Sequence, residues 1–166
     1  MAVDFITNLE KGMEKLHKSG AFLTVKAGDI TNTMTISWGS IGFIWGKPSF
    51  TALVRESRYT HELLEKADSF TVSIPYTEEM KKALAICGSK SGRDIDKEKE
   101  TGIKFVPSRE VESAIVDNCN LYYECKIVYK QDMDPKMVDK AVAEQAYANG
   151  NYHTLYYGEI VASYEK

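Results

Sequence analysis

The feature of this sequence that most constrains its fold is a series of strand-like segments without the regular strand–helix alternation of a parallel sheet. β-Branched and aromatic residues concentrate in segments bounded by glycine, proline and polar turn residues, at positions 21–27, 34–38, 49–55, 70–74, 119–130 and 153–163. This pattern predicts a mainly β protein, an antiparallel barrel with helices packed outside it.

Helical segments are predicted between some of these strands. Phe5, Leu9, Met13 and Leu16 recur at helical spacing and indicate an opening amphipathic helix. Further helices are predicted at 61–67 with Thr60 as N-cap, at 78–86 after Thr77, and from Asp134-Pro135 through residue 148. Residues 39–48 are predicted to be a glycine-rich connection, and residues 88–102 a long polar loop.

The bulk properties suit one compact domain over residues 1–166, because 43% of the 166 residues are hydrophobic. A net charge of -3 argues against a general role on nucleic acid or an anionic membrane. No apolar run approaches the ~20 residues that span a bilayer, and the first residues do not resemble a secretion signal. The expected location is therefore cytoplasmic.

Cysteines and histidines give no metal site or nucleophile. Cys87, Cys119 and Cys125 form no Cys-x-x-Cys pair and are predicted to be small buried hydrophobic residues. His17 and His61 have no metal-ligand spacing and are predicted at the surface. No serine or cysteine lies in a Gly-x-Ser-x-Gly context, which argues against a hydrolase.

A basic, hydroxyl-rich turn follows the strand at 49–55. Arg55, Ser57, Arg58 and Thr60 lie within six residues, where a strand is predicted to meet a helix. Arginine forks and the free N–H groups of a helix start suit a phosphate. Strand alternation places Arg55 and Ser57 on one face and directs Arg58 elsewhere. The alternative is a solvated turn in which Thr60 only caps the helix.

The strand at 34–38 combines hydroxyls with bulky side chains. Thr35 and Ser37 share one face, whereas Met34, Ile36 and Trp38 share the other. A flat heterocycle needs polar groups at its edge and apolar packing on its faces, and this strand can supply both. The alternative is a half-buried strand that exposes threonine and serine to water.

The loop Ser89-Lys90-Ser91-Gly92-Arg93-Asp94, with Lys97 beyond it, carries hydroxyls and charges of both signs. It can fold over a phosphate or over the edge of a ring. The alternative is a solvated charged loop.

At these residues the chain resembles the flavin reductase-like family, and within it the flavoredoxin-type FMN-binding split-barrel proteins. The resemblance covers roughly residues 21–164. The matching motifs, in order, are Asn32-Thr33-Met34-Thr35-Ile36-Ser37-Trp38-Gly39, Trp45-Gly46-Lys47-Pro48, Arg55-Glu56-Ser57-Arg58-Tyr59-Thr60, the Ser89–Asp94 loop, and His153-Thr154-Leu155-Tyr156-Tyr157-Gly158-Glu159-Ile160.

The resemblance implies a six-stranded antiparallel split barrel that forms a homodimer, with FMN near each subunit interface. It places Thr35, Ser37 and Trp38 along the ring and ribityl chain, and Met34 beside them is also expected to bind the cofactor. A second group would hold the phosphate: Arg55, Ser57, Tyr59 and Thr60. A third would close over the cofactor: Ser89, Lys90, Ser91 and Lys97.

The implied function is an FMN-dependent oxidoreductase, with NAD(P)H as candidate electron donor. NAD(P)H-using relatives often carry Gly-Asp-His before the last strand, whereas this chain has Gly150-Asn151-Tyr152-His153 and lacks the carboxylate. His153 is therefore predicted to be a strand residue with a hydrogen-bonded ring rather than an acid. The alternatives are a non-catalytic FMN-binding or electron-carrier module, and a relative that binds another phosphorylated ring of the pyridoxal type.

Overall fold

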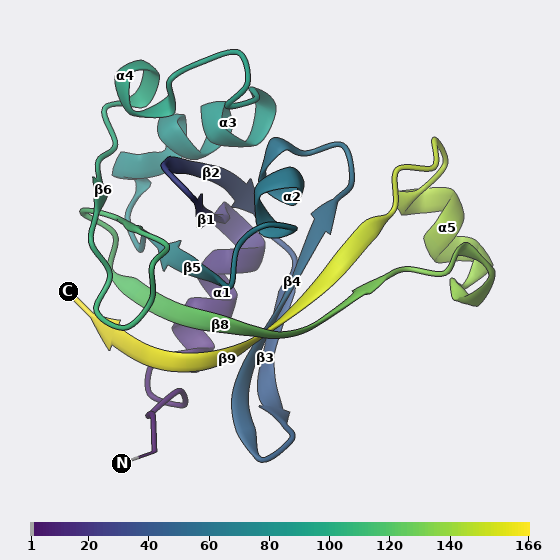
Figure 1. Cartoon of the computed structure of the whole chain (residues 1–166), viewed down its shortest axis with the longest axis horizontal. Coiled ribbons are helices and arrows are strands. Elements are labelled where there is room, and N and C mark those ends of the chain that lie inside the picture. Colours follow the sequence, from purple (N-terminus) through teal and green to yellow (C-terminus); the bar gives the residue numbers. More distant parts are fainter. Residues whose placement is uncertain (1) are drawn as a thin grey trace.

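A computed structural model describes residues 2–166 and contains one large antiparallel sheet (Figure 1). The strand order is β2-β1-β5-β8-β9-β4-β3, so the sheet has seven strands where the resemblance implied six. The bounds of these strands are β1 Ala21–Ala27, β2 Ile30–Ile36, β3 Gly39–Ile44, β4 Lys47–Arg55, β5 Ser69–Ile74, β8 Leu121–Asp132 and β9 His153–Glu165. A separate pair is formed by β6 Phe105–Val106 and β7 Ile115–Val116. The prediction of a mainly β protein with flanking helices is confirmed.

Strand β3 occupies the stretch that was predicted to be a glycine-rich connection, and that prediction is wrong. It pairs with β4 in a hairpin whose turn is Trp45-Gly46. Both turn residues have positive φ, at 56° and 69°, which matches the right-handed twist of the two strands. The glycines of this segment lower its strand propensity, so cross-strand pairing decides its structure.

The helices differ from the prediction mainly at their ends. Their bounds are α1 Leu9–Ser19, α2 Tyr59–Leu64, α3 Lys81–Ser89, α4 Lys97–Thr101 and α5 Lys140–Ala146, with single 3₁₀ turns at η1 Glu78–Met80 and η2 Pro135–Met137. The single helix predicted from Pro135 to residue 148 is divided, because the carboxylate of Asp139 accepts hydrogen bonds from Ala141 and Val142 and starts α5.

Two further helix predictions are corrected. The N-cap of α2 is Arg58 rather than Thr60, whose hydroxyl instead accepts a hydrogen bond from Asn32. Helix α4 lies inside the stretch predicted to be a loop. It begins after Asp96, whose carboxylate accepts from the N–H of Lys99, and it ends at Gly102 with φ of 77°.

The sheet has a hydrophobic cluster on each face. On one face, α1 packs with Leu16 against a cluster that includes Leu23, Phe50 and Phe70. On the other, a cluster extends from α3 to β8; it consists of Phe22, Ala83, Leu84, Cys87, Ile103, Ile115, Val116, Cys119 and Tyr122. All three cysteines are buried and free, as predicted.

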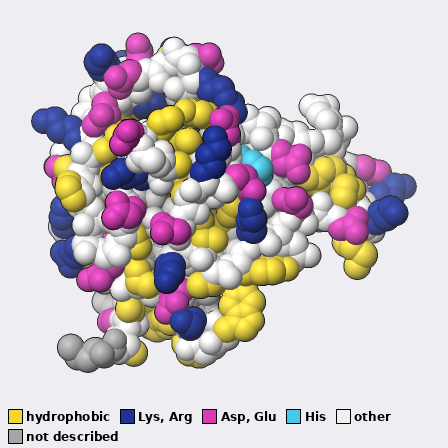
Figure 2. Space-filling model, in the orientation of Figure 1, with side chains coloured by type: hydrophobic (Ala, Val, Ile, Leu, Met, Phe, Trp, Pro, Cys, Tyr) yellow, Lys and Arg dark blue, Asp and Glu magenta, His cyan; other side chains and the backbone are white. Residues whose placement is uncertain are grey.

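The second half of β8, helix α5 and the start of β9 form an arm that projects from the body (Figure 1). The first five residues of β8 are buried, whereas those beyond them are mostly exposed. Helix α5 contains no buried residue. On the face shown in Figure 2, basic and acidic side chains are interspersed over the body and the arm. No helix within residues 2–166 combines the length and the apolarity needed to cross a bilayer.

Candidate functional site

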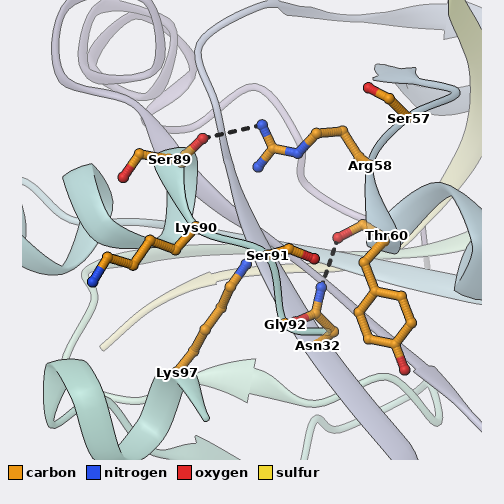
Figure 3. Close-up of a pocket in the computed structure, with 11 residues that line it drawn as sticks. Asn32, Ser57, Arg58, Thr60, Ser89, Lys90, Ser91, Gly92 and Lys97 are labelled. Carbon is orange, nitrogen blue, oxygen red and sulfur yellow. Dashed lines mark hydrogen bonds between the residues drawn. The ribbon is translucent and has the colours of Figure 1, made fainter. Parts of the chain in front are cut away.

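A cavity of about 150 Å³ lies where three segments meet: strand β2, the turn between β4 and α2, and the loop that follows α3 (Figure 3). Helices α2 and α3 both contact β2, and this packing brings the segments together. The lining residues are Asn32, Ser57, Arg58, Tyr59, Thr60, Gly88, Ser89, Lys90, Ser91, Gly92 and Lys97. We call this cavity the first pocket.

Lys97 is the most deeply buried charge in the first pocket, with 5% of its surface exposed. Its ammonium donates hydrogen bonds to the carbonyl oxygens of Thr33 at 2.6 Å and Cys87 at 3.2 Å. Burial lowers the pKa of Lys97 to about 8, and the nearby charge of Arg58 acts in the same direction. A buried ammonium with only neutral carbonyl partners is costly unless an anion joins it.

Arg58 places a second cation beside Lys97. Its guanidinium donates to the carbonyl oxygens of Gly88 at 3.1 Å and Cys87 at 3.3 Å. Burial lowers the pKa of Arg58 from its ordinary value. Within the described part of the chain, neither Arg58 nor Lys97 forms an ion pair with a carboxylate. The pocket therefore holds positive charge without a protein counter-ion.

Hydroxyl groups complete the first pocket. Thr60 is buried, and its oxygen accepts a hydrogen bond from the amide of Asn32 at 2.9 Å, which leaves its own proton free to donate. Ser57 is exposed at the mouth. Ser91 accepts a hydrogen bond from the N–H of Arg93 at 3.1 Å, and Ser89 donates to the carbonyl of Ala85 at 2.8 Å.

The loop over the first pocket is attached to α2 by Arg93. Its guanidinium lies 3.1 Å from the carboxylate of Glu62 and 4.9 Å from the centre of the Tyr59 ring. Beneath the same loop, Gly92 approaches Asn32 so closely that a Cβ atom on Gly92 would lie 2.1 Å from the Asn32 side-chain oxygen. The exposed side chain of Lys90 extends away from Thr60 (Figure 3).

A second pocket, of about 170 Å³, lies near the ends of β2 and β4. It is lined by Ile36, Ser37, Trp38, Leu53, Arg55 and His153. Trp38 is 50% exposed, and its ring centre lies 5.5 Å from that of His153. Arg55 lines this second pocket and not the first.

His153 is buried at the start of β9, and its Nδ1 lies 2.6 Å from the hydroxyl of Tyr147. Burial lowers the pKa of His153 to about 4, and the charge of Arg55 lowers it further. These contacts fit the prediction of a strand residue with a hydrogen-bonded ring. The surface prediction for His61 is wrong, because its ring is half-buried and its Nε2 lies 2.9 Å from the hydroxyl of Thr154.

The lowered pKa of His153 leads us to expect that the free energy of unfolding falls in acid. The folded-state pKa lies below the usual 6.5, so between pH 6.5 and 4 the unfolded state binds more protons, and stability falls as the pH falls through that range. At 1.36 kcal/mol per pKa unit, His153 costs about 2.5 kcal/mol at pH 4.5. Urea unfolding at pH 7.5 and 4.5 should show a smaller acid loss for His153→Gln than for the unchanged protein. Equal losses would contradict this assignment.

The two pockets are lined by the same two segments of the chain, and we call the surface between them the groove. Along β2, residue numbers rise from Asn32 in the first pocket to Ile36 at the second. Along the β4–α2 segment they fall from Thr60 in the first pocket to Arg55 in the second. Thr35 lies between the ends on β2, and its hydroxyl donates to the carbonyl of Leu84 at 2.5 Å. The groove suits a ligand with an anionic end and a flat ring.

The structure brings most of the predicted residues into these two pockets. Of the predicted group, Ser57, Tyr59, Thr60, Ser89, Lys90, Ser91 and Lys97 line the first pocket, and Ser37, Trp38 and Arg55 line the second. Thr35 lies between the two pockets, and its hydroxyl donates a hydrogen bond to Leu84 of α3. The alternative in which the Thr35 hydroxyl faces water is therefore wrong. Met34 is packed in the hydrophobic cluster on the α1 face.

Four residues that shape the site lie outside the groups predicted from the sequence: Asn32, Arg58, Gly92 and Asn151. Asn32 and Arg58 lie within the predicted motifs, and Gly92 lies within the polar loop. Their position beside predicted site residues in the sequence therefore indicates that they belong to the site. Asn151 has a left-handed backbone with φ of 53°, and its side-chain oxygen accepts the N–H of Ser57 at 3.3 Å. It is far from the motifs in sequence, and no local pattern indicates it.

Fold and site together define a mainly β protein with a cationic, hydroxyl-lined pocket and a second pocket lined by Trp38 and Arg55. The family model for the flavin reductase like domain matches residues 13–166, so the chain belongs to the flavin reductase-like family. An uncharacterised protein of Archaeoglobus fulgidus is 25% identical over 149 residues, which cover 90% of this chain and 73% of that protein.

Solved structures show the same split-barrel fold. Flavoredoxin from Methanosarcina acetivorans is similar with a TM-score of 0.69 and 25% identity, over 89% of this chain and 68% of that one. Flavoredoxin of Desulfovibrio vulgaris (Miyazaki F) gives a TM-score of 0.70 at 22% identity, over 89% and 69% of the two chains.

Proposed function

We propose that this protein binds FMN and passes electrons through it, as an oxidoreductase of the flavin reductase or flavoredoxin type. The observation that carries the proposal is the pair Lys97 and Arg58, two cations whose partners are backbone carbonyls in a pocket lined by hydroxyls. A phosphate dianion supplies the missing counter-charge. Family membership and the flavoredoxin fold support FMN as the molecule that carries this phosphate.

The residues divide between the two ends of the groove. Arg58, Lys97 and Thr60 would hold the phosphate, with the serines of the turn and loop at its edge. Ser37 and Trp38 would lie beside the ring. Bound flavin accepts and releases electrons, and the protein contributes orientation, local charge and exclusion of water. NAD(P)H is the proposed donor, and free flavin, a metal centre or a protein is the proposed acceptor.

A non-catalytic FMN-binding or electron-carrier module is the second candidate. It is favoured by the segment Gly150-Asn151-Tyr152-His153, which lacks the carboxylate that NAD(P)H-using relatives often carry before the last strand, and which includes Asn151. Here its side chain binds the N–H of Ser57 and its carbonyl binds Arg55. Both contacts are structural, so this position offers no acid or base.

Binding is tested by titrating the purified protein with FMN. We expect a dissociation constant in the micromolar range or below, which corresponds to about -8 kcal/mol or better. At 100 times that concentration, FMN should stabilise the fold by about 2.7 kcal/mol and raise the melting temperature. A protein without yellow colour whose melting temperature ignores FMN would exclude the proposal. Pyridoxal phosphate serves as the competing ligand, and tighter binding of it would favour the pyridoxal-type alternative.

Electron transfer is tested by mixing the FMN complex with NADH or NADPH in a stopped-flow instrument. Loss of flavin absorbance at 450 nm with either nucleotide would establish a reductase. Retained absorbance, together with reduction by dithionite, would favour the carrier module.

We also propose that the protein is a homodimer. Large apolar side chains are exposed on the arm, where Met137 is 82% exposed and Val142 47%. Trp38 beside the second pocket is also half exposed. A partner subunit would cover such surfaces. Light scattering during gel filtration measures the mass, and a mass equal to the 18.7 kDa chain would contradict a dimer.

A further inference from the structure

Arg55 places a cation at the second pocket, whereas Arg58 and Lys97 line the first. It lines the second pocket with Ser37 and His153. Because Arg55 does not line the pocket that is proposed to hold the phosphate, its charge needs a separate explanation.

The Arg55 guanidinium is held in a fixed position by the segment before β9. One terminal nitrogen donates to the carbonyl oxygen of Asn151 at 2.8 Å, and the other donates to that of Ala146 at 3.1 Å. Its carbon lies 5.2 Å from the centre of the Tyr147 ring. These partners orient the guanidinium but leave its charge uncompensated, and residues 2–166 contain no ion pair with Arg55.

No other charge lies among the side chains of the second pocket at neutral pH. Its lining residues besides Arg55 are apolar or uncharged, because burial lowers the pKa of His153 to about 4 and keeps its ring neutral. The positive charge of Arg55 contributes to that lowered pKa, so its field reaches the ring that packs against Trp38.

We propose that Arg55 sets the reduction potential of the bound flavin by stabilising the negative charge of its reduced ring. This inference rests on the proposed FMN binding. Two electrons and one proton convert the neutral oxidised ring into an anionic reduced ring, and a fixed cation nearby favours the form that carries the charge. Arg55 is therefore a residue that tunes the cofactor and is separate from the phosphate-holding cations.

The phosphate end provides a matched comparison. The phosphate carries the same charge in both redox states, so Arg58→Gln should weaken oxidised and reduced FMN by the same factor. Arg55→Gln should weaken reduced FMN about tenfold more than oxidised FMN, given the size of a single charge interaction at a partly exposed site. A tenfold difference between the two affinities lowers a two-electron potential by about 30 mV.

The experiment measures the midpoint potential of the FMN complexes by anaerobic dithionite titration against reference dyes, together with the affinity for oxidised FMN. We expect a lower potential for Arg55→Gln, a smaller change for Arg55→Lys because it retains the charge, and no change for Arg58→Gln. An unchanged potential in Arg55→Gln, or an equal fall in Arg58→Gln, would overturn the inference. Should Arg55→Gln fail to fold, Arg55→Met takes its place with the same expected fall in potential, and an unchanged potential in that variant would overturn the inference. Failure of the unchanged protein to bind FMN would instead overturn the proposed function.

Discussion

Replacement of Lys97 by methionine is expected to weaken FMN binding about 100-fold, equivalent to about 3 kcal/mol. Methionine has a similar length and no charge, so the substitution removes the buried ammonium and its hydrogen bond to a phosphate, an interaction worth about 1.5–3 kcal/mol. The flavin dissociation constant, measured by fluorescence quenching at pH 7, gives the result directly.

The same lysine predicts how FMN binding depends on pH. Lys97 has a pKa of about 8 in the free protein, and a bound phosphate would hold its ammonium form. Above pH 8 the complex therefore carries a proton that the free protein lacks, so affinity should fall by up to about tenfold per pH unit. Below pH 8 the ammonium is already charged, and this contribution to the affinity is constant.

Lys99 offers a matched control, because it lies on the same helix α4 with an exposed side chain that does not line the first pocket. Lys99→Met should retain both the affinity and the fall above pH 8, whereas Lys97→Met should lose both. Equal affinities for the two variants at pH 7 would show that the Lys97 ammonium does not hold the ligand.

The sequence was a good guide wherever a local pattern determines structure. Strand β1 has the bounds that its composition predicted, because its β-branched and aromatic residues form one buried segment that ends at Gly28-Asp29. The hydroxyl-rich turn and the serine loop line one pocket, although 28 or more residues separate Thr60 from Ser89 and the loop beyond it. The ordered family motifs supplied that pairing, and periodicity alone did not.

The positions of Arg55 and Arg58 differ from those that strand alternation predicts. Strand alternation placed Arg55 toward the phosphate and Arg58 elsewhere, yet Arg58 lines the first pocket and Arg55 the second. Strand β4 ends at Arg55, so a period of two residues does not continue through the turn that follows. The backbone of the turn then decides where the Arg58 side chain lies.

The sequence also does not predict the burial of Lys97, which depends on packing between separate helices. Lys97 lies in a run of alternating charges that reads as a solvated surface, but packing of α4 beside α3 covers its side chain. The helix itself had a usable signature, namely Asp96 as N-cap and Gly102 at the C-terminal end. That signature predicts a helix but does not predict which of its lysines is buried.

Introduction of a methyl group at Gly92 is expected to reduce FMN affinity by at least about tenfold without unfolding the protein. The Cβ atom of Gly92→Ala would lie 2.1 Å from the side-chain oxygen of Asn32, far inside van der Waals contact. Asn32 is buried and its amide donates to Thr60, so it cannot move without breaking that hydrogen bond. The loop must therefore lift away from the first pocket, and it takes Ser91 with it.

Gly42 supplies the control for the general effect of replacing glycine by alanine. Neither glycine has positive φ, and a Cβ at Gly42 meets nothing within 4 Å. Both variants restrict the unfolded chain to a similar degree, an effect of about 0.4–1 kcal/mol. FMN titration and thermal unfolding of the two variants separate the contributions. Gly42→Ala should bind FMN as the unchanged protein does, and tight binding by Gly92→Ala would mean that closure of the loop on Asn32 does not hold the phosphate.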